Sequence, residues 1–295
     1  MFERVCIVGV GLLGGSLARD LRSHGLAKHV VGVTRSDSSA RLCQELGVVD
    51  SVQPLASAVT NAELVVVATP MQTMLPVLKE LAKHVHPDAI ITDVGSVKMD
   101  LYKCIKRDLR DLLPQCVLAH PIAGGENSGV VASRENLFES KHVIMTSCPE
   151  QNGAKVEKVT AMWRSVGAKT LTMSLEQHDA IFAKTSHLPH VVAFSLVNYL
   201  NQQPNRDELF ELAASGFYDF TRIASSDAEM WRDICMTNHD QILTALQGYI
   251  DQLTQIKNEI AAQDQDAVFQ YFEQAKSSRD SGLNAKLAQL DSTAS

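Results

Sequence analysis

The sequence has no excess of positive charge. Its 295 residues carry 27 Lys and Arg against 34 Asp and Glu, so the formal net charge at pH 7 is -7. A chain with this balance has no general attraction for nucleic acid or for an anionic membrane surface. We therefore expect neither as a partner, and local positive charge must hold any anionic substrate. The hydrophobic fraction of 45% is ordinary for a globular protein and argues against disorder.

Paired cysteines and long apolar runs are missing as well. The six cysteines are scattered, and none belongs to a C-x-x-C pair. This pattern indicates free thiols in a reducing compartment and argues against a disulfide framework or a zinc site. No apolar run is long enough to cross a bilayer, and no signal peptide fits before the strand-like run Val5–Val10. We expect a soluble protein of the cytoplasm.

The first 173 residues alternate short β-branched runs with amphipathic stretches. This alternation predicts βαβ units and an α/β fold with a doubly wound parallel sheet. Several runs end at Gly or Pro, and such ends mark the carboxyl edge of the sheet, where open α/β folds bind ligands. The expected strands are Val5–Val10, Val30–Val33, Leu64–Ala68, Ile90–Val94, Val117–Ala119, Val143–Thr146 and Lys169–Met173.

The pattern changes near Met173. The next four residues, Ser174-Leu175-Glu176-Gln177, have the form of a capping box, and only helices are predicted after them. The expected domains are a dinucleotide-binding domain, residues 1–173, and an all-α domain, residues 174–295. The helical half has more apolar surface than one short bundle would bury, which predicts a homodimer through it. The expected helices are His178–Leu200, Glu208–Phe217, Met230–Ile260 and Asp266–Lys276, before a frayed tail, Leu287–Ser295.

A glycine-rich turn follows the first expected strand. Gly9-Val10-Gly11-Leu12-Leu13-Gly14 has the spacing G-x-G-x-x-G and leads into an expected helix, which is the context of a dinucleotide-binding turn. Gly9 allows the tight turn, Gly11 lets the backbone approach a pyrophosphate, and Gly14 permits close packing of helix on strand. The pyrophosphate would lie against backbone N–H groups at the helix N-terminus, beside Leu12 and Leu13. The alternative is an ordinary glycine-rich turn.

The end of the second expected strand indicates which cofactor is bound. NAD sites usually have Asp or Glu there, whereas this chain has Thr34, Arg35 and Ser36, with Asp37 later. A guanidinium and two hydroxyls suit a 2′-phosphate, so NADP is favoured over NAD. The alternative is that Arg35 stacks on adenine while Asp37 reaches the ribose of NAD. Thr69, after the third run, completes the expected cofactor-binding set.

Further polar motifs follow strand ends or lie in the helical half. They are Thr92–Lys98 (TDVGSVK), His120–Gly129 (HPIAGGENSG), His178-Asp179, Ser186–His190 (SHLPH), Gly216–Ala224 (GFYDFTRIA) and Met230–Ile234 (MWRDI). With the glycine turn before them, they resemble the prephenate/arogenate dehydrogenase family, from about Val5 to Asn238. The resemblance implies a Rossmann-type sheet with a helical dimerisation domain and a nicotinamide cofactor. It also implies oxidative decarboxylation of prephenate, arogenate or both, on the route to tyrosine.

His120 is the expected catalytic residue. It follows an expected strand at the carboxyl edge, and an imidazole can take up a proton near neutral pH. The resemblance implies that His120 bonds the ring hydroxyl and withdraws its proton as hydride leaves the same carbon. The alternative is a buried structural histidine. Ser96, at the same edge, is implied to bond this hydroxyl, His120 or the nicotinamide amide, although a turn or cap residue would look the same.

Substrate recognition is expected in the helical half. His187 and His190 are three residues apart and share a helix face, which Pro189 should kink. No third ligand completes a metal site, so none is predicted. The resemblance implies that His190 contacts the substrate, with His187 in contact or in support, and that Arg222 binds the side-chain carboxylate. A guanidinium suits a carboxylate, but a surface ion pair is the alternative for Arg222.

Four other polar residues are kept out of the expected site. Lys98 is expected to be exposed at the start of a helix. His178, with Glu176, is expected to stabilise a helix N-terminus and not to take part in catalysis. Arg232 is expected to form a local pair with Asp233 and is left out of the site.

Two other functions remain open on the sequence alone. One is a Rossmann dehydrogenase of the β-hydroxyacid type, whose catalytic lysine Lys184 could represent. The other is a non-catalytic nicotinamide-binding sensor, which would have no need of the histidines and Arg222.

Overall fold

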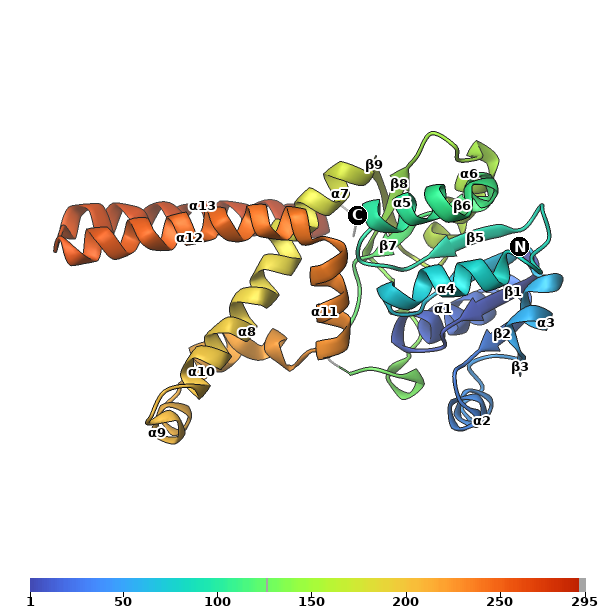
Figure 1. Ribbon diagram of the computed structural model, residues 1–295, viewed down its shortest axis with the longest axis horizontal. Coiled ribbons are helices and arrows are strands. Elements are labelled where there is room, and N and C mark those ends of the chain that lie inside the picture. The colour runs from blue at the N-terminus through green and yellow to red at the C-terminus, as the bar shows by residue number, and fades with distance from the viewer. Residues whose placement is uncertain (126, 292–295) are drawn as a thin grey trace. The chain divides into compact units, whose positions relative to one another are not determined.

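The main sheet has six parallel strands in the order β3-β2-β1-β4-β5-β6 (Figure 1). The computed structural model describes residues 1–125 and 127–291. The order reverses between β1 and β4, and this switch point is where doubly wound sheets bind ligands. The expected Rossmann-type sheet is confirmed. Its strands are β1 (Phe2–Val8), β2 (Ala27–Val33), β3 (Ser51–Val52), β4 (Leu64–Val67), β5 (Ile90–Asp93) and β6 (Cys116–Val117).

Apolar side chains bury both faces of this sheet. All four residues of β4, Leu64–Val67, are buried, as expected for a central parallel strand covered on both sides. Leu17 on α1 and Trp163 on α6 have no exposed surface within the same core. Each such side chain contributes about 1.5–3 kcal/mol by burial. The helices of this part are α1 (Leu12–Ser23), α2 (Asp37–Glu45), α3 (Leu55–Thr60), α4 (Met71–Leu81), α5 (Met99–Asp108) and α6 (Gly153–Ser165), with 3-10 turns at Arg110–Gln115 and Val130–Ala132.

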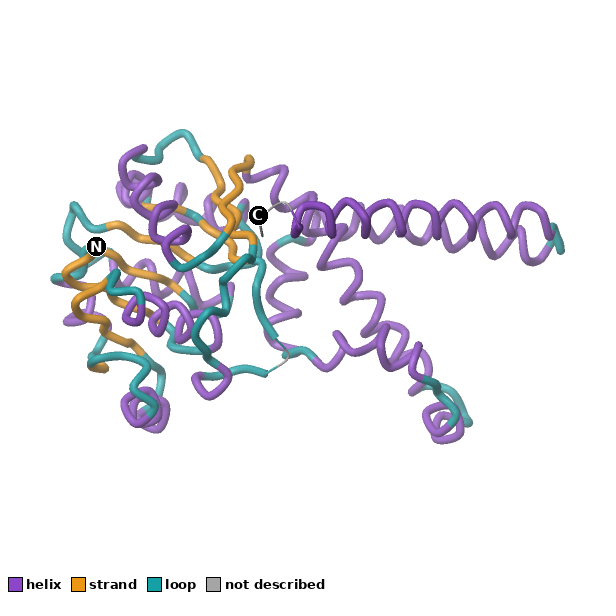
Figure 2. Tube along the Cα trace, turned by 180° about the vertical axis from the view of Figure 1, so that it is seen from behind, coloured by secondary structure: helices purple, strands orange, loops and turns teal. Residues whose placement is uncertain are grey.

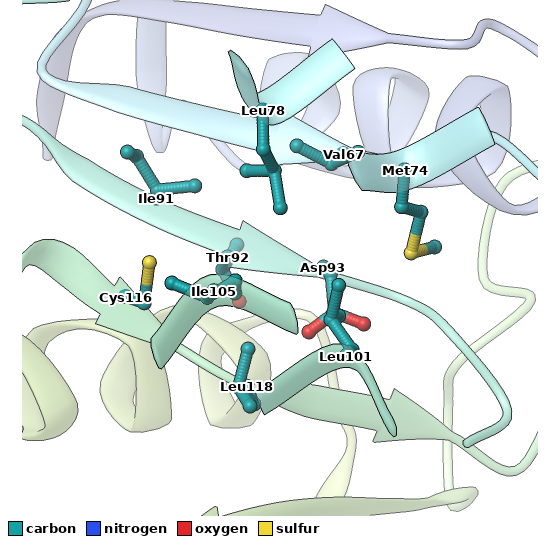
Figure 3. A pocket seen from close by; sticks show the side chains of 10 residues that line it. All are labelled: Val67, Met74, Leu78, Ile91, Thr92, Asp93, Leu101, Ile105, Cys116 and Leu118. Carbon is teal, nitrogen blue, oxygen red and sulfur yellow. The ribbon is translucent and has the colours of Figure 1, made fainter. Parts of the chain in front are cut away.

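A small cavity lies in this core, between the strands and helices α4 and α5 (Figure 3). Its volume is about 10 Å³, room for a single water at most. Met74 and Leu78 of α4 and Leu101 and Ile105 of α5 line it, with the carboxylate of Asp93 at one end. The cavity is a packing defect and is too small for a substrate.

A second, three-stranded sheet follows the first. It has the order β7-β8-β9, with β7 (Ala119–Pro121) antiparallel and β9 (Lys169–Ser174) parallel to β8 (His142–Ser147). The single strand expected at Val117–Ala119 was wrong, because the chain changes sheets at Leu118, whose carbonyl accepts from the Thr146 amide at 3.0 Å. His120 therefore lies within a strand and does not follow one.

The part after β9 is helical in the described residues (Figure 2). The capping box is confirmed: the Ser174 hydroxyl accepts from the Gln177 amide, and the Gln177 side chain accepts from the Ser174 amide. The kink expected at Pro189 stays a prediction. A π-helical turn, Ala183–His187, directly precedes Leu188, and Pro189 stands in the first turn of α8, where its missing N–H costs little. The segments are α7 (Leu175–Phe182), η3 (Ala183–His187), α8 (Leu188–Asn201), α9 (Arg206–Glu211), α10 (Ser215–Thr221), η4 (Arg222–Ser225) and α11 (Ala228–Thr237).

By internal contacts the chain divides into two compact units, Met1–Ile242 and Leu243–Ser295. The helix expected at Met230–Ile260 is broken near Asn238, where α11 ends and α12 (His239–Ala261) begins. Helix α13 (Gln265–Asp291) runs beside α12 in the opposite direction (Figures 1 and 2). The tail expected to fray is helical to Asp291, and its last four residues lie outside the described residues. The domain boundary at Met173 stays a prediction.

No helix of the described residues is long and apolar enough to cross a membrane. All six cysteines are free thiols.

Candidate active site

The turn between β1 and α1 requires glycine at two positions. Gly9 has φ +95°, and a Cβ there would lie 2.5 Å from the carbonyl oxygen of Ala68. At Gly14 a Cβ would lie 2.2 Å from the carbonyl oxygen of Gly9. The turn is therefore pressed against the end of β4, and the expected reasons for these two glycines are confirmed.

The same turn fits a dinucleotide cofactor. Gly11 caps α1 without a side-chain hydrogen bond, so backbone N–H groups of the first turn are available to an anion. A Cβ at Gly11 would meet nothing within 4 Å, which leaves open space where a pyrophosphate would approach. The hydroxyl oxygen of Thr69, after β4, is buried without a partner among the described residues. A pyrophosphate or ribose could satisfy it, while Leu12 and Leu13 are half-buried at the helix start.

The turn after β2 uses some of its own hydrogen-bonding groups. The Ser36 hydroxyl caps α2 by accepting from the Ser39 amide, and Thr34 Oγ1 donates to the Ser36 carbonyl at 3.2 Å. Arg35 is exposed, and Asp37 stands in the first turn of α2. Thr34 and Ser36 therefore already form hydrogen bonds within this turn. Of the three residues expected to bind the 2′-phosphate, Arg35 is the one whose side chain forms no hydrogen bond inside the turn.

His120 contacts α7 from strand β7. Its Nδ1 lies 2.8 Å from Nε2 of His178, and its ring packs edge-on against Phe182 at a centroid distance of 4.9 Å. Burial lowers the pKa of His120 well below its usual value, and nearby His178, Lys98 and His187 act in the same direction. The imidazole is therefore neutral near pH 7, as a proton acceptor must be.

The contacts of His178 differ from those expected of a residue that stabilises a helix N-terminus. This side chain has no exposed surface and joins His120 to Asp179, whose Oδ1 lies 2.7 Å from His178 Nδ1. A single histidine after a capping box gave no signal of this, because His120 is 58 residues away in the chain. The His178-Asp179 pair was visible in the sequence, but only the packing of β7 against α7 gives it a partner.

Lys98 was expected to be exposed, and this was wrong. It is fully buried, and its ammonium bonds the carboxylate of Asp93 and, at 2.7 Å, the carbonyl of Ala119. The Asp93 carboxylate also accepts from the amides of Gly95 at 2.8 Å and Ala119 at 3.1 Å. Burial lowers the pKa of Lys98, whereas the Asp93 carboxylate opposes this shift.

This ion pair fixes two parts of the expected site against each other. Ser96 is half-buried in the turn after β5, next to Gly95, whose amide is bonded to Asp93. His120 follows Ala119, which Asp93 and Lys98 hold through its amide and carbonyl. The turn of Ser96 and the strand of His120 are therefore positioned by one buried pair.

His187 and His190 have different surroundings. His187 is 1% exposed, its Nδ1 lies 3.1 Å from Nδ2 of Asn238, and its Nε2 is buried without a partner among the described residues. Burial lowers the pKa of His187 to about 4. His190 donates from Nδ1 to the Ser186 carbonyl at 2.9 Å, and its ring stacks on Trp231 at a centroid distance of 3.7 Å.

Arg222 and Arg232 are both exposed. Arg222 is exposed at the start of η4, which packs against α8, the helix of His190. Its contact with a substrate stays a prediction. Arg232 forms the local pair expected for it, 2.6 Å from Asp233. Glu126 lies outside the described residues.

The alternative catalytic lysine does not join this cluster. Lys184 is exposed on η3, while His187 on the same turn is buried. Within residues 1–125 and 127–291, no three His, Cys, Asp or Glu side chains could hold a metal ion together. A dinucleotide turn at the switch point of a parallel sheet, with a neutral imidazole pair in the same compact unit, defines a nicotinamide-dependent dehydrogenase.

Comparison with known proteins narrows this class to one family. Residues 17–172 match the family model "Prephenate dehydrogenase, nucleotide-binding domain", and residues 174–274 match "Prephenate dehydrogenase, dimerization domain". The prephenate dehydrogenase of Bacillus subtilis is 36% identical over 283 residues, 95% of this chain and 76% of its own. The cyclohexadienyl dehydrogenase of Zymomonas mobilis is 31% identical over 284 residues, 95% and 96% of the two chains.

A solved structure agrees with these relatives. Prephenate dehydrogenase from Aquifex aeolicus, in complex with hydroxyphenyl propionate and NAD+, superimposes with a TM-score of 0.89 at 35% identity, over 95% of this chain and 98% of that one. The chain belongs to the prephenate/arogenate dehydrogenase family and is an oxidoreductase with a nicotinamide cofactor.

Proposed function

We propose that the chain oxidatively decarboxylates prephenate, arogenate or both, as a step toward tyrosine. The proposal rests on the position of His120: it follows Ala119, which Asp93 and Lys98 hold at the carboxyl end of β5, and burial lowers the pKa of its imidazole. A base at this position can take the proton of the ring hydroxyl while hydride leaves the same ring carbon. The hydroxyl oxygen becomes that of a ring ketone. The bond to the ring carboxylate then breaks and releases CO₂, its electron pair makes the ring aromatic, and the ketone oxygen becomes that of a phenol by taking the proton back from His120.

The residues around His120 are assigned from their chemistry. Ser96 can donate to the same hydroxyl oxygen, and the buried Nε2 of His187 has hydrogen-bonding capacity to satisfy. His190, held by its stack on Trp231, can bond a polar group of the substrate. Arg222 supplies the guanidinium that an anionic side chain requires in a chain of net charge -7.

The cofactor supplies the hydride acceptor, and we propose NADP as the favoured form. The support is the absence of a carboxylate at the end of β2 and the position of Arg35 there. NAD is the alternative, since Asp37 stands only two residues further along and the Aquifex aeolicus relative was solved with NAD+.

The assembly and the location of the protein are also proposed. A homodimer through the helical half is supported by the family model that matches residues 174–274, which describes a dimerization domain. A monomer mass in light scattering would contradict it. The expected location in the cytoplasm stays a prediction.

The decisive experiment is a kinetic comparison of both substrates with both cofactors. We expect NADP with at least one cyclohexadiene substrate to be the best pair, and a clear preference for NAD would contradict the cofactor proposal alone. His120→Gln and Lys184→Ala form a matched test of the mechanism. Loss of turnover only in the lysine variant would favour the β-hydroxyacid type and contradict the proposed reaction.

A further inference from the structure

The Asp179 carboxylate determines the direction of every hydrogen bond around it. It is 3% exposed and accepts from the amides of Lys98 and Met99, each at 2.9 Å. Its third neighbour is Nδ1 of His178, at 2.7 Å from Oδ1. A carboxylate that receives two backbone N–H groups can only accept, so the His178 Nδ1 must carry a proton and donate it.

The proton on His178 Nδ1 also fixes the direction of the hydrogen bond between His178 and His120. His178 has no exposed surface, and burial lowers its pKa even though the bond to Asp179 opposes this shift. A neutral ring that is protonated on Nδ1 carries a lone pair on Nε2. The His120 Nδ1 lies 2.8 Å from that lone pair and must therefore donate to it. His120 is left with its own lone pair on Nε2.

We propose that His178 and Asp179 are positioning residues, which hold His120 in the tautomer with its proton on Nδ1 and its lone pair on Nε2. This inference rests on the proposed function, in which His120 accepts the hydroxyl proton. Without the pair, a neutral imidazole is free to adopt the other tautomer, which presents an N–H where a lone pair is needed.

The same chain of bonds stabilises His120 once it has taken the proton. The charged ring still donates from Nδ1 to His178, and His178 still donates to the Asp179 carboxylate, so no proton moves along the chain. The ionisable groups that act on His120 come from three elements: His178 of α7, Lys98 before α5 and His187 of η3. Of these, the Lys98 charge is paired with the Asp93 carboxylate.

Three variants test the positioning role of His178 and Asp179. In Asp179→Asn, an amide group replaces one acceptor, so His178 or a backbone N–H loses its partner. His178→Leu removes the acceptor for His120, while His178→Gln keeps an oxygen that can accept. We expect kcat to fall about 100-fold or more in the first two variants and less than about 10-fold in the third. The KM values for substrate and cofactor should change by less than about 3-fold, because these side chains act through His120.

Tautomers can be observed directly by ¹⁵N spectra of histidine-labelled full-length protein, with His120→Gln used to assign the signal. We expect the His120 Nε2 to be unprotonated in the wild type, and its signal to show the Nε2-protonated form in Asp179→Asn or His178→Leu. Glu176→Gln, an exposed carboxylate on the same helix, is the matched control and should leave kcat and the spectrum unchanged.

The possible results separate the two proposals. A wild type that turns over neither substrate with either cofactor contradicts the proposed function. An active wild type with His120 protonated on Nε2, or His178→Leu as active as the wild type, overturns the positioning role alone. If Asp179→Asn does not fold, the two His178 variants decide, since they leave both backbone bonds of Asp179 in place; equal loss of kcat in the Leu and Gln variants would also overturn it.

Discussion

The glycine turn and the histidine cluster differ in how much of the chain each needs. The turn is made by six consecutive residues, Gly9–Gly14, between one strand and one helix. The cluster joins segments that are far apart: His120 and His178 are separated by 58 residues, and Lys98 and Asp179 by 81. A site built from one segment can be read from its spacing, whereas a site built from several depends on how the elements pack.

The largest effect should come from the histidine cluster, which is built from distant segments of the chain. We expect His120→Gln to lower kcat by about 10²–10⁴-fold, since it removes the base, and to leave the cofactor dissociation constant unchanged within error. Steady-state kinetics and a fluorescence titration of the cofactor measure both. An equal loss of cofactor affinity would show that the two parts of the site are not separable.

Lys98→Met tests whether the buried ion pair of Lys98 and Asp93 stabilises the histidine cluster. Removal of one member of a buried ion pair leaves Asp93 as an uncompensated charge and should cost about 3–5 kcal/mol in the free energy of unfolding. Denaturant unfolding measures this change. Lys103→Met, an exposed lysine on α5, is the control and should have little effect. A loss in Lys98→Met no larger than in the control would show that the pair has no structural role.

Two glycine variants test the glycine turn. Gly9→Ala forces a Cβ against the Ala68 carbonyl at a positive φ and should cost about 1–3 kcal/mol of stability. Gly11→Ala places its Cβ in open space, so it should leave the unfolding transition unchanged and raise the KM for the cofactor. If Gly11→Ala bound the cofactor normally, the proposed path of the pyrophosphate would be wrong.

The smallest effect should be a pH dependence of stability. The pKa of His187 is about 4 in the folded protein, below its usual value near 6.5, so the unfolded chain binds more protons between these values. Stability is therefore full above about pH 6.5 and falls as the pH drops toward about 4, by about 1 kcal/mol between pH 7 and pH 5.5 for this group.

His187→Gln should flatten that slope, and His142→Gln, an exposed histidine on β8, should not. Urea unfolding at several pH values makes the comparison. Equal slopes in the two variants would mean that other groups, such as His120 and His178, account for the whole dependence.

The errors made from the sequence have one physical cause. The β-branched runs predicted the strands of the main sheet, and the capping box at Ser174 predicted the start of α7, because both signals are local. The change of sheets at Leu118 was missed, since an apolar run looks the same in either sheet. Lys98 was taken for a surface residue because lysine is rarely buried. Its ammonium can bond the Asp93 carboxylate and the Ala119 carbonyl only when β5, β7 and the start of α5 pack together.

By itself, the sequence determined the dinucleotide turn, the alternation that builds a parallel sheet, and the change to helices after Met173. These depend on backbone conformations and periodicities that a few neighbouring residues dictate. Only the tertiary structure decided that His178 and Asp179 stand behind His120 and that a buried lysine holds its strand. Hydrogen-bond direction and burial arise between segments, and no single segment carries them.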